Sequence, residues 1–480
     1  MTSRRSLLKF LALAPVAATL AGTAFAVPAS GKASFASRRP PVGKRKFVSP
    51  AVERAIAQTK ARIADPELAW LFENCYPNTL DTTVEVGTLD GQPDTFVVTG
   101  DIDAMWMRDS SAQVWPYVSL AKEDKALQRL FHGLIRRHAV CIGIDPYANA
   151  FMPDPKAKSN LDWAQHDITD MRPGVAERKW EIDSLCYPIR LAYGYWQATG
   201  DRTPFDDSWH AAMRKVVQTF KEQQRKDGPG PYKFQRTSQN PTESQFLQGY
   251  GNPTRPTGMI HAMFRPSDDA TLYPFNIPGN LFAVTSLGQL ATMLRQRFRD
   301  ETLAAECEAL AAEIRQAVET HGVIRDSQGD LWAYEVDGYG NQLFMDDANV
   351  PSLLALPYLG SCKREDARYR RTRAAVWSAR NPYFFKGRAG EGIGGPHEGM
   401  RMIWPMSIMM RAFTSNDEAE IAQSLRMLKS THADTGFMHE AFDQDNPATF
   451  TRSWFAWANT LFGELMVQTV QHYPAALRQV

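Results

Sequence analysis

Carboxylates, arginines and tryptophans gather in seven short stretches of this chain, more densely than a helix surface requires. These stretches are residues 100–110, 181–187, 264–269, 345–349, 394–397, 436–440 and 451–457. Two carboxyl groups, one giving up a proton and one receiving a proton, can together hydrolyse the acetal of a sugar. Aromatic rings bind the apolar face of a sugar, and Arg, Asn and Asp bind its hydroxyl groups. The residue types therefore favour hydrolysis of a sugar acetal.

Each stretch also has a purely structural interpretation. Ser267-Asp268-Asp269 is suited to capping a helix, because negative charge is favoured at a helix N-terminus. Asp346 and Asp347 have the same ambiguity, and Arg108-Asp109 is compatible with an ion pair within one helix. A capping loop can also present an acid to a substrate, so the two interpretations are compatible.

Metal chemistry is the main alternative, since clustered Asp and Asn suit Ca²⁺. The sequence contains no D-x-[DN]-x-[DN]-G loop ending in Glu, and no H-x-x-x-H or H-E-x-x-H pattern. A G-x-S-x-G elbow, a G-x-G-x-x-G turn and a P-loop are also missing from the sequence. We therefore expect no metal and no cofactor.

Helical periodicity predicts the elements that position these stretches. It predicts twelve helices, near residues 51–76, 105–121, 124–142, 183–199, 206–225, 278–297, 300–319, 349–358, 363–378, 401–414, 416–430 and 452–472. Asp90-Gly91 and Asp337-Gly338, each between alternating apolar residues, predict two β-hairpins. Twelve helices make six pairs. We expect an all-α fold, a toroid of six helical hairpins with small β-hairpin insertions; an open helical bundle is the alternative.

The first 50 residues differ from the rest. Arg4-Arg5 before a short apolar run, followed by Ala24-Phe25-Ala26, indicates a cleaved twin-arginine signal over residues 1–26. This predicts a bacterial protein that is periplasmic or secreted, with no stable membrane insertion after cleavage. Residues 27–50 are basic without an acid and predict a mobile linker, and residues 51–480 a single catalytic domain.

Charge and cysteine content exclude further classes. The basic residues of the first 50 positions leave a net acidic body, because the whole chain carries 54 Lys and Arg against 53 Asp and Glu. An acidic body argues against nucleic acid as a partner. The five cysteines are widely spaced and form no C-x-x-C pair, which predicts neither a disulfide framework nor a zinc site.

Ten motifs in order make the sequence resemble a known family. They are TTVEV at 82–86, TGDI at 99–102, AMW at 104–106, RDS at 108–110, IDPYANAF at 144–151, EIDSLCYP at 181–188, FRPSDDA at 264–270, MDDANVPS at 345–352, GFMHE at 436–440 and WFAW at 454–457. From about residue 70 to about residue 465 the chain closely resembles glycoside hydrolase family 125, the metal-independent exo-α-1,6-mannosidases of bacteria and fungi.

The resemblance implies an (α/α)₆ barrel and the release of single α-mannose units with inversion of configuration. It implies that Asp268 is the general acid and Glu440 the general base, without a metal. Mannose-containing oligosaccharides, such as N-glycan or mannan fragments, would be the substrates. The residues that we expect to bind the sugar are Asp101, Trp106, Arg108, Asp109, Arg265, Asp269, Asp346, Asn349, His397 and Trp454.

The sequence departs from the usual family pattern at Asp103, Glu398, His432 and Asp434. These positions fall in the expected substrate loops, so they bear on linkage preference and on the leaving-group side. Two alternatives remain open at this point. One is an inverting α-glucosidase or trehalase-like hydrolase on the same fold, and the other is a mannoside-binding protein without catalysis.

Overall fold

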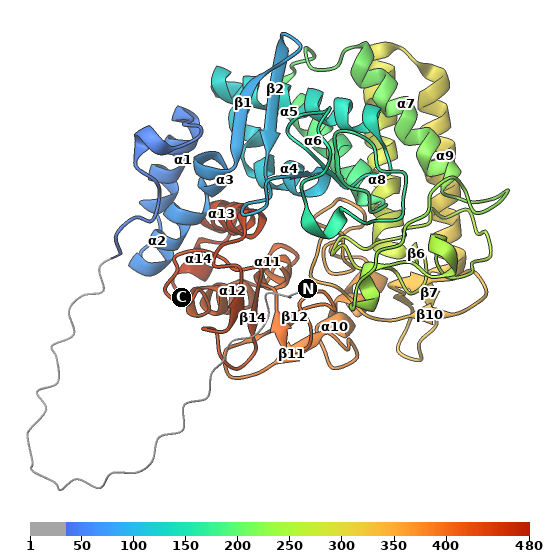
Figure 1. The fold of residues 1–480 in the computed structure, drawn as a ribbon. Helices are drawn as coiled ribbons and strands as arrows, with labels where there is room; N and C mark the ends of the chain where they lie inside the picture. Colours follow the sequence, from blue (N-terminus) through green and yellow to red (C-terminus); the bar gives the residue numbers. More distant parts are fainter. Residues whose placement is uncertain (1–34) are drawn as a thin grey trace, which may run out of the picture. The chain divides into compact units, whose positions relative to one another are not determined.

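Helices dominate the part of the chain that the computed structural model describes, residues 35–480 (Figure 1). Within residues 37–480, which form one compact unit, the α-helices are α1 (Pro50–Lys60), α2 (Pro66–Cys75), α3 (Asn78–Thr82), α4 (Met107–Val114), α5 (Lys125–Ile144), α6 (Asp183–Thr199), α7 (Asp207–Glu222), α8 (Ile277–Met293), α9 (Glu301–His321), α10 (Ala367–Val376), α11 (Pro405–Phe413), α12 (Glu418–Ser430), α13 (Ala456–His472) and α14 (Pro474–Leu477).

Short 3₁₀ and π turns extend or connect these helices. The 3₁₀ segments are η1 (Val42–Lys44), η2 (Trp115–Glu123), η3 (Asp162–Ala164), η4 (Pro241–Glu243) and η5 (Leu247–Gly249), and the π segment is η6 (Leu294–Phe298). The expected signal over residues 1–26 lies outside the described residues.

The helices form an inner ring with outer partners. In the inner ring α13 packs against α4, α4 against α6 and α6 against α8, and α11 closes onto α13. Outer helices pack behind them, with α5 beside α6, α7 against α5 and α9, α9 against α8 and α12 against α11. This is the (α/α)₆ arrangement, which confirms the predicted fold. α8 is the most hydrophobic of these helices: most of its residues are buried, as expected of a helix covered on both sides.

Aspartates set where several helices begin. The side chains of Asp65, Asp124, Asp206, Asp300 and Asp417 each accept a hydrogen bond from a backbone N–H in the first turn of the following helix. The cap at Asp65, with proline directly after it, splits the helix predicted over residues 51–76 into α1 and α2.

The helix predicted over residues 349–358 is the clearest error in the predicted elements. The chain forms consecutive turns there. Two prolines, Pro351 and Pro357, remove backbone donors from this segment. The backbone N–H groups of Leu353 and Leu354 donate to the carboxylate of Asp346 instead of continuing a helix.

The strands are short and form small antiparallel sheets. They are β1 (Val84–Leu89), β2 (Gln92–Val97), β3 (Met105–Trp106), β4 (Ala150–Phe151), β5 (Val175–Glu177), β6 (Phe275–Asn276), β7 (Val323–Ile324), β8 (Leu331–Trp332), β9 (Glu335–Val336), β10 (Gln342–Leu343), β11 (Phe384–Lys386), β12 (Glu391–Ile393), β13 (Met402–Ile403), β14 (Ala441–Asp443) and β15 (Phe450–Thr451). The sheets join β1-β2, β3-β4-β5, β10-β9-β6, β7-β8, β11-β12 and β13-β14-β15.

Both predicted hairpins are present. β1 and β2 pair from Val84 with Val97 to Leu89 with Gln92, so that Asp90 and Gly91 make the two-residue turn with positive φ. The second hairpin is shorter than predicted, because only β9 and β10 pair across Asp337-Gly338. The expected first part of that strand is β8, which pairs with β7.

Residues 37–50 differ from the mobile linker expected over residues 27–50, because they belong to the same compact unit as the barrel. Arg39 donates from Nε to Asp81 (2.8 Å) and from Nη1 to Glu53 (3.0 Å). Its side chain is only 5% exposed. Fourteen residues of the expected linker are therefore part of the folded unit.

Two further features concern membrane spans and cysteines. None of the helices within residues 35–480 is long and apolar enough to cross a membrane. The five cysteines are free thiols, four of them buried.

Candidate active site

The chemically rich stretches of the sequence meet where the inner helices begin. Arg108 and Asp109 lie in the first turn of α4, Glu181 lies just before α6, and Trp404 just before α11. A cavity of about 420 Å³ lies there. Its lining residues are Thr99, Ile102, Trp106, Arg108, Asp109, Pro266, Ser267, Asp268, Asn349, His397, Trp404, Glu440, Arg452, Phe455 and Trp457. We call it the inner cavity.

Asp268 stands in a tight turn before α8. Its backbone N–H donates to the carbonyl of Arg265 (2.9 Å), and its φ is +66°, in the left-handed region. The carboxylate accepts hydrogen bonds from Arg108 Nη2 (3.1 Å) and Asn149 Nδ2 (3.4 Å), and its side chain is 23% exposed. Burial alone would raise the pKa of Asp268, but Arg108, a hydrogen bond with Glu181, and Lys179 lower it well below its usual range.

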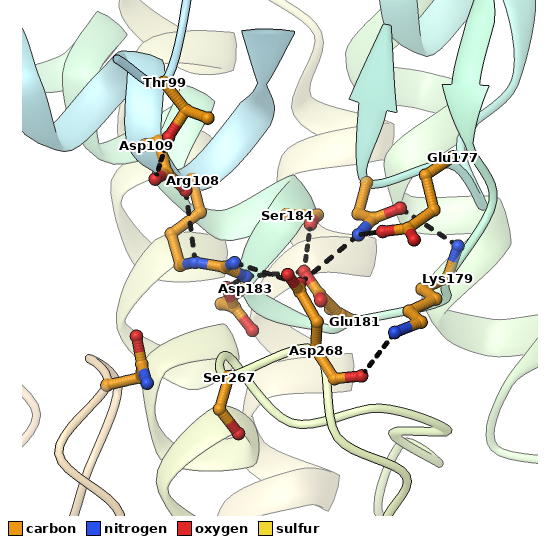
Figure 2. A network of polar contacts seen from close by, with 12 residues as sticks. Thr99, Arg108, Asp109, Glu177, Lys179, Glu181, Asp183, Ser184, Ser267 and Asp268 are labelled. Carbon is orange, nitrogen blue, oxygen red and sulfur yellow. Dashed lines mark hydrogen bonds and ion pairs between the residues drawn. The ribbon is translucent and has the colours of Figure 1, made fainter. Parts of the chain in front are cut away.

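Arg108 connects Asp268 to two further carboxylates. Figure 2 shows its guanidinium group between Asp268, Glu181 and Asp183. Nη1 donates to Glu181 Oε2 at 2.6 Å and to Asp183 Oδ2 at 3.3 Å. Burial raises the pKa of Glu181 well above its usual range, against the charge of Arg108. Nη1 and Nη2 of Arg108 therefore both donate to protein carboxylates, and one of these carboxylates is Asp268.

Glu440 lies in the same cavity, directly before β14, and is 6% exposed. Its nearest cation is Arg452, whose Nε lies 3.5 Å from Glu440 Oε2. Burial raises the pKa of Glu440 to about 7; Arg452 opposes this shift, and the charge of Glu398 adds to it. Glu440 therefore exchanges its proton near neutral pH.

His397 is held by Asp269, the neighbour of Asp268 in the chain. His397 Nδ1 lies 3.5 Å from Asp269 Oδ1, and Asp269 is fully buried. Burial alone would lower the pKa of His397, but the bond to Asp269 and the charges of Glu440 and Asp268 raise it to about 10. A protonated imidazolium therefore lines the cavity that also contains Asp268 and Glu440.

A second cavity, which we call the outer cavity, adjoins the first and has a volume of about 1420 Å³. It is lined by Ile102, Trp106, Asp162, Trp163, His166, Glu177, Lys179, Arg236, Thr237, Ser238, Asn240, Glu243, Asp268, His397 and Arg452. Asp268 lines both cavities, whereas Glu440 lines only the inner one. Arg236 fixes the outer wall by ion pairs to Glu177 (2.9 Å) and Glu243 (2.7 Å).

The structure brings together seven of the twelve predicted site residues. Those that line the inner cavity are Trp106, Arg108, Asp109, Asp268, Asn349, His397 and Glu440. Asp269 lies behind His397, and Asp101 lies near the cavity, 3.6 Å from Arg452. Trp454 packs near Gly100 without lining either cavity.

Two predicted sugar-binding residues have other partners. Arg265 donates to both carboxylate oxygens of Glu335 (2.6 and 3.0 Å) and is 5% exposed. Asp346 is fully buried and accepts the backbone N–H groups described above. Neither residue lines the inner or the outer cavity, so the structure does not bring them to the site.

Several lining residues were not predicted. Ser267, Arg452 and Trp457 lie in stretches whose composition had already marked them, so only their individual roles were missing. Trp404 lies in a segment predicted simply as helix, and no signal in the sequence distinguishes it. The remaining unpredicted residues of the inner cavity are Thr99, Ile102, Pro266 and Phe455.

One group within residues 35–480 has side chains suited to a metal ion. Ligand atoms of His397, Glu398 and Glu440 all lie within 4.8 Å of one another. The imidazole of His397 is protonated at neutral pH, because its pKa is raised to about 10, and a protonated nitrogen is no ligand. A metal ion at this position would have to displace that proton.

An all-α barrel whose cavity contains two carboxyls beside aromatic side chains is an arrangement typical of glycoside hydrolases. The chain belongs to the metal-independent α-mannosidases, family GH125, whose family model matches residues 65–467. This confirms the family recognised from the motifs.

Two relatives cover nearly the whole chain. A Streptococcus pneumoniae metal-independent α-mannosidase, solved in a non-productive substrate complex with α-1,6-mannobiose, is 38% identical, with a TM-score of 0.85 over 89% of this chain and 99% of its own. The Schizosaccharomyces pombe meiotically up-regulated gene 157 protein is 42% identical over 94% of this chain and 92% of its own. A bacterial glucoamylase complexed with acarbose, 14% identical with a TM-score of 0.51 over 85% of this chain and 57% of its own, shares the fold alone.

The fission-yeast relative corrects the predicted localisation. A match over 94% of this chain to a eukaryotic protein contradicts a bacterial, periplasmic or secreted protein exported by a twin-arginine signal. That prediction depended on Arg4-Arg5 and a short apolar run. Such a composition is a weak signal, because few residues carry it.

Proposed function

We propose that this chain is an inverting exo-α-mannosidase that removes terminal α-1,6-linked mannose. Asp268 acts as the general acid on the glycosidic oxygen. Glu440 acts as the general base on the water that attacks the opposite face of the sugar. The terminal mannose occupies the inner cavity, and the rest of the glycan occupies the outer cavity.

The observation that carries this proposal is the division of the two carboxyls between the cavities. A general acid has to reach the oxygen between the terminal sugar and its leaving group. Asp268 lines both cavities and so lies at their boundary. A general base in an inverting enzyme belongs on the far side of the terminal sugar, and Glu440 lines the inner cavity only.

Unpaired donors on two residues that line the inner cavity support a sugar as its occupant. The indole Nε1 atoms of Trp106 and Trp404 are buried and have no hydrogen-bond partner among the described residues. Buried donors normally have partners, so an unpaired donor in a cavity indicates a polar ligand. Hydroxyl groups of a sugar would accept from both indoles while the ring packs against the aromatic faces.

The outer cavity supports a glycan as the leaving group. Trp163 is 45% exposed there, with Nε1 donating to Glu177 (3.2 Å), so its ring is available to stack on a sugar. The 38% identical Streptococcus pneumoniae enzyme binds α-1,6-mannobiose, which supports the α-1,6 linkage.

Hydrolysis of α-1,6-, α-1,3- and α-1,2-mannobiose, with the anomer of released mannose followed by NMR, tests the proposal. We expect turnover of α-1,6-mannobiose above the other two and β-mannose as the first product. First release of the α-anomer would contradict inversion, and preference for another mannobiose would contradict the linkage.

Two further measurements distinguish the alternative functions. Faster hydrolysis of an aryl α-glucoside than of an aryl α-mannoside would favour the α-glucosidase alternative. Binding of mannobiose without turnover would favour a mannoside-binding protein.

A further inference from the structure

The surroundings of Asp268 do not favour the protonated state that a general acid needs. Arg108 and Asn149 donate to its carboxylate, and Lys179 Nζ donates to its backbone carbonyl at 2.8 Å. The imidazolium of His397 adds a further positive charge. All of these groups stabilise the ionised carboxylate. A proton available to Asp268 must therefore be held by a neighbouring group.

Glu181 is the neighbour that can hold this proton. It is 0% exposed, and Figure 2 shows it between Asp268 and Ser184. Its Oε2 accepts from Arg108 (2.6 Å) and from Ser184 Oγ (2.9 Å). Its Oε1 is fully buried and accepts from no donor among the described residues. Arg108 donates to both Glu181 (2.6 Å) and Asp268 (3.1 Å), which brings the two carboxyls within reach of each other, so that a carboxyl–carboxyl hydrogen bond can join them.

Such a bond requires one proton for the two carboxyls, because two carboxylates in contact repel each other. A hydroxyl at Glu181 Oε1 that donates to Asp268 would give the unpaired oxygen its partner. The negative charges of Asp183 and Asp109 favour a proton on this pair, whereas the positive charges of Arg108, Lys179 and His397 oppose it. Burial of Glu181, the group farther from solvent, places the proton on it in the resting enzyme.

We propose that Glu181 and Asp268 share one proton, and that Glu181 passes it to Asp268 as Asp268 protonates the glycosidic oxygen. This inference rests on the proposed function. Glu181 lines neither cavity, so it is a positioning residue that acts through Asp268.

Every proton that moves in one turnover has a donor and an acceptor. The O–H bond of Glu181 breaks as Asp268 gains its proton, and Asp268 delivers a proton to the leaving oxygen as the glycosidic C–O bond breaks. Glu181 is left as a carboxylate held by Arg108 and Ser184. Glu440 takes the proton of the attacking water. Exchange with solvent removes that proton from Glu440 and returns one to the Glu181–Asp268 pair.

The test is Glu181→Gln, assayed on aryl α-mannosides with a poor and a good leaving group. The amide cannot transfer a proton, so kcat/KM should fall about 10²–10³-fold for the poor leaving group and less than about tenfold for the good one. The basic limb of the pH profile should move to lower pH by at least about one unit. This is the expected sign, because Asp268 alone, with its pKa lowered, keeps its proton only at lower pH.

Asp183→Asn is the matched control. Asp183 is equally buried and also contacts Arg108, but no hydrogen bond joins it to Asp268. A residue that acts only by supporting Arg108 should change kcat/KM for both substrates by the same factor. Asp183→Asn should therefore show no dependence on the leaving group and a smaller shift of the basic limb. The inference would be overturned if Glu181→Gln lowered kcat/KM equally for both mannosides and left the basic limb of the pH profile in place.

Failure of the proposed function would look different, because the wild-type enzyme would then hydrolyse neither mannoside.

If Glu181→Gln does not fold, Ser184→Ala is the second variant. It removes the hydroxyl that stabilises ionised Glu181, so the basic limb should move to higher pH. An unmoved or lowered limb in Ser184→Ala would equally overturn the inference.

Discussion

The acid side and the base side of the inner cavity use the same functional group in opposite electrostatic surroundings. Asp268 lies among cations, and its pKa is lowered. Glu440 is more deeply buried, with one arginine at 3.5 Å and the carboxyl of Glu398 nearby, and its pKa is raised to about 7. Taken alone, a lowered pKa opposes the role of Asp268 as an acid, and a raised pKa opposes the role of Glu440 as a base. The place of each carboxyl relative to the two cavities therefore indicates its role, while the neighbouring carboxyls, Glu181 and Glu398, influence its pKa.

Removing each carboxyl should have the largest effect. We expect Asp268→Asn and Glu440→Gln each to lower kcat by at least about 10²–10⁴-fold, the usual contribution of general acid–base catalysis. A good leaving group needs little protonation, so it should partly rescue Asp268→Asn but not Glu440→Gln. Kinetics on two aryl α-mannosides measures both effects, and thermal unfolding should show that each variant remains folded.

Asp269→Asn is the control for this pair, because Asp269 is adjacent to Asp268 and chemically identical. It contacts His397 and lines neither cavity. We expect it to retain more activity than Asp268→Asn. The acid would be misassigned if Asp269→Asn lost turnover and Asp268→Asn kept it.

Glu398→Gln should have an intermediate effect, on the pH profile rather than on the maximal rate. Glu440 acts when ionised, so activity rises with pH through its pKa of about 7. Removing the charge of Glu398 lowers that pKa, and the acid limb of kcat/KM should move to lower pH by about 0.5–1 unit. Glu313→Gln, on the surface beside Lys226, is the matched control. A limb that stayed in place or rose would contradict the electrostatic link between Glu398 and Glu440.

Chelation should have the smallest effect, namely none. The acid and the base suffice for hydrolysis, and the imidazolium of His397 opposes a cation beside Glu398 and Glu440. We expect kcat/KM to be unchanged after EDTA treatment and dialysis. Loss of activity that Ca²⁺ or Zn²⁺ restores would contradict the metal-free mechanism.

Local patterns in the sequence predicted much of the fold. The α6 boundaries and the β1–β2 turn follow from helical period and from Asp90-Gly91, both of which act over a few residues. The turns at residues 353–360 were missed because the carboxylate of Asp346 binds the backbone there. A helical period contains no information about such a competing partner.

The site was predicted less completely for a related reason. Composition marked the stretches around Asp268 and Glu440, but only the ring of helices decides which side chains face the cavity. Arg265 and Glu335 are 70 positions apart, and their pairing removes Arg265 from the candidates. Glu181 was noted within its stretch and given no role, because its contact with Asp268 depends on the fold.

The left-handed backbone at Asp268 affects how a substrate complex of this enzyme should be trapped. At a φ of +66° a residue with a β-carbon is strained, and asparagine tolerates this conformation better than most. Asp268→Asn therefore keeps the turn that holds Arg265 and Asp268 together. Asp268→Ala would remove the carboxyl and also relax or distort the turn, so a complex trapped with alanine would report an altered loop as well as a missing acid.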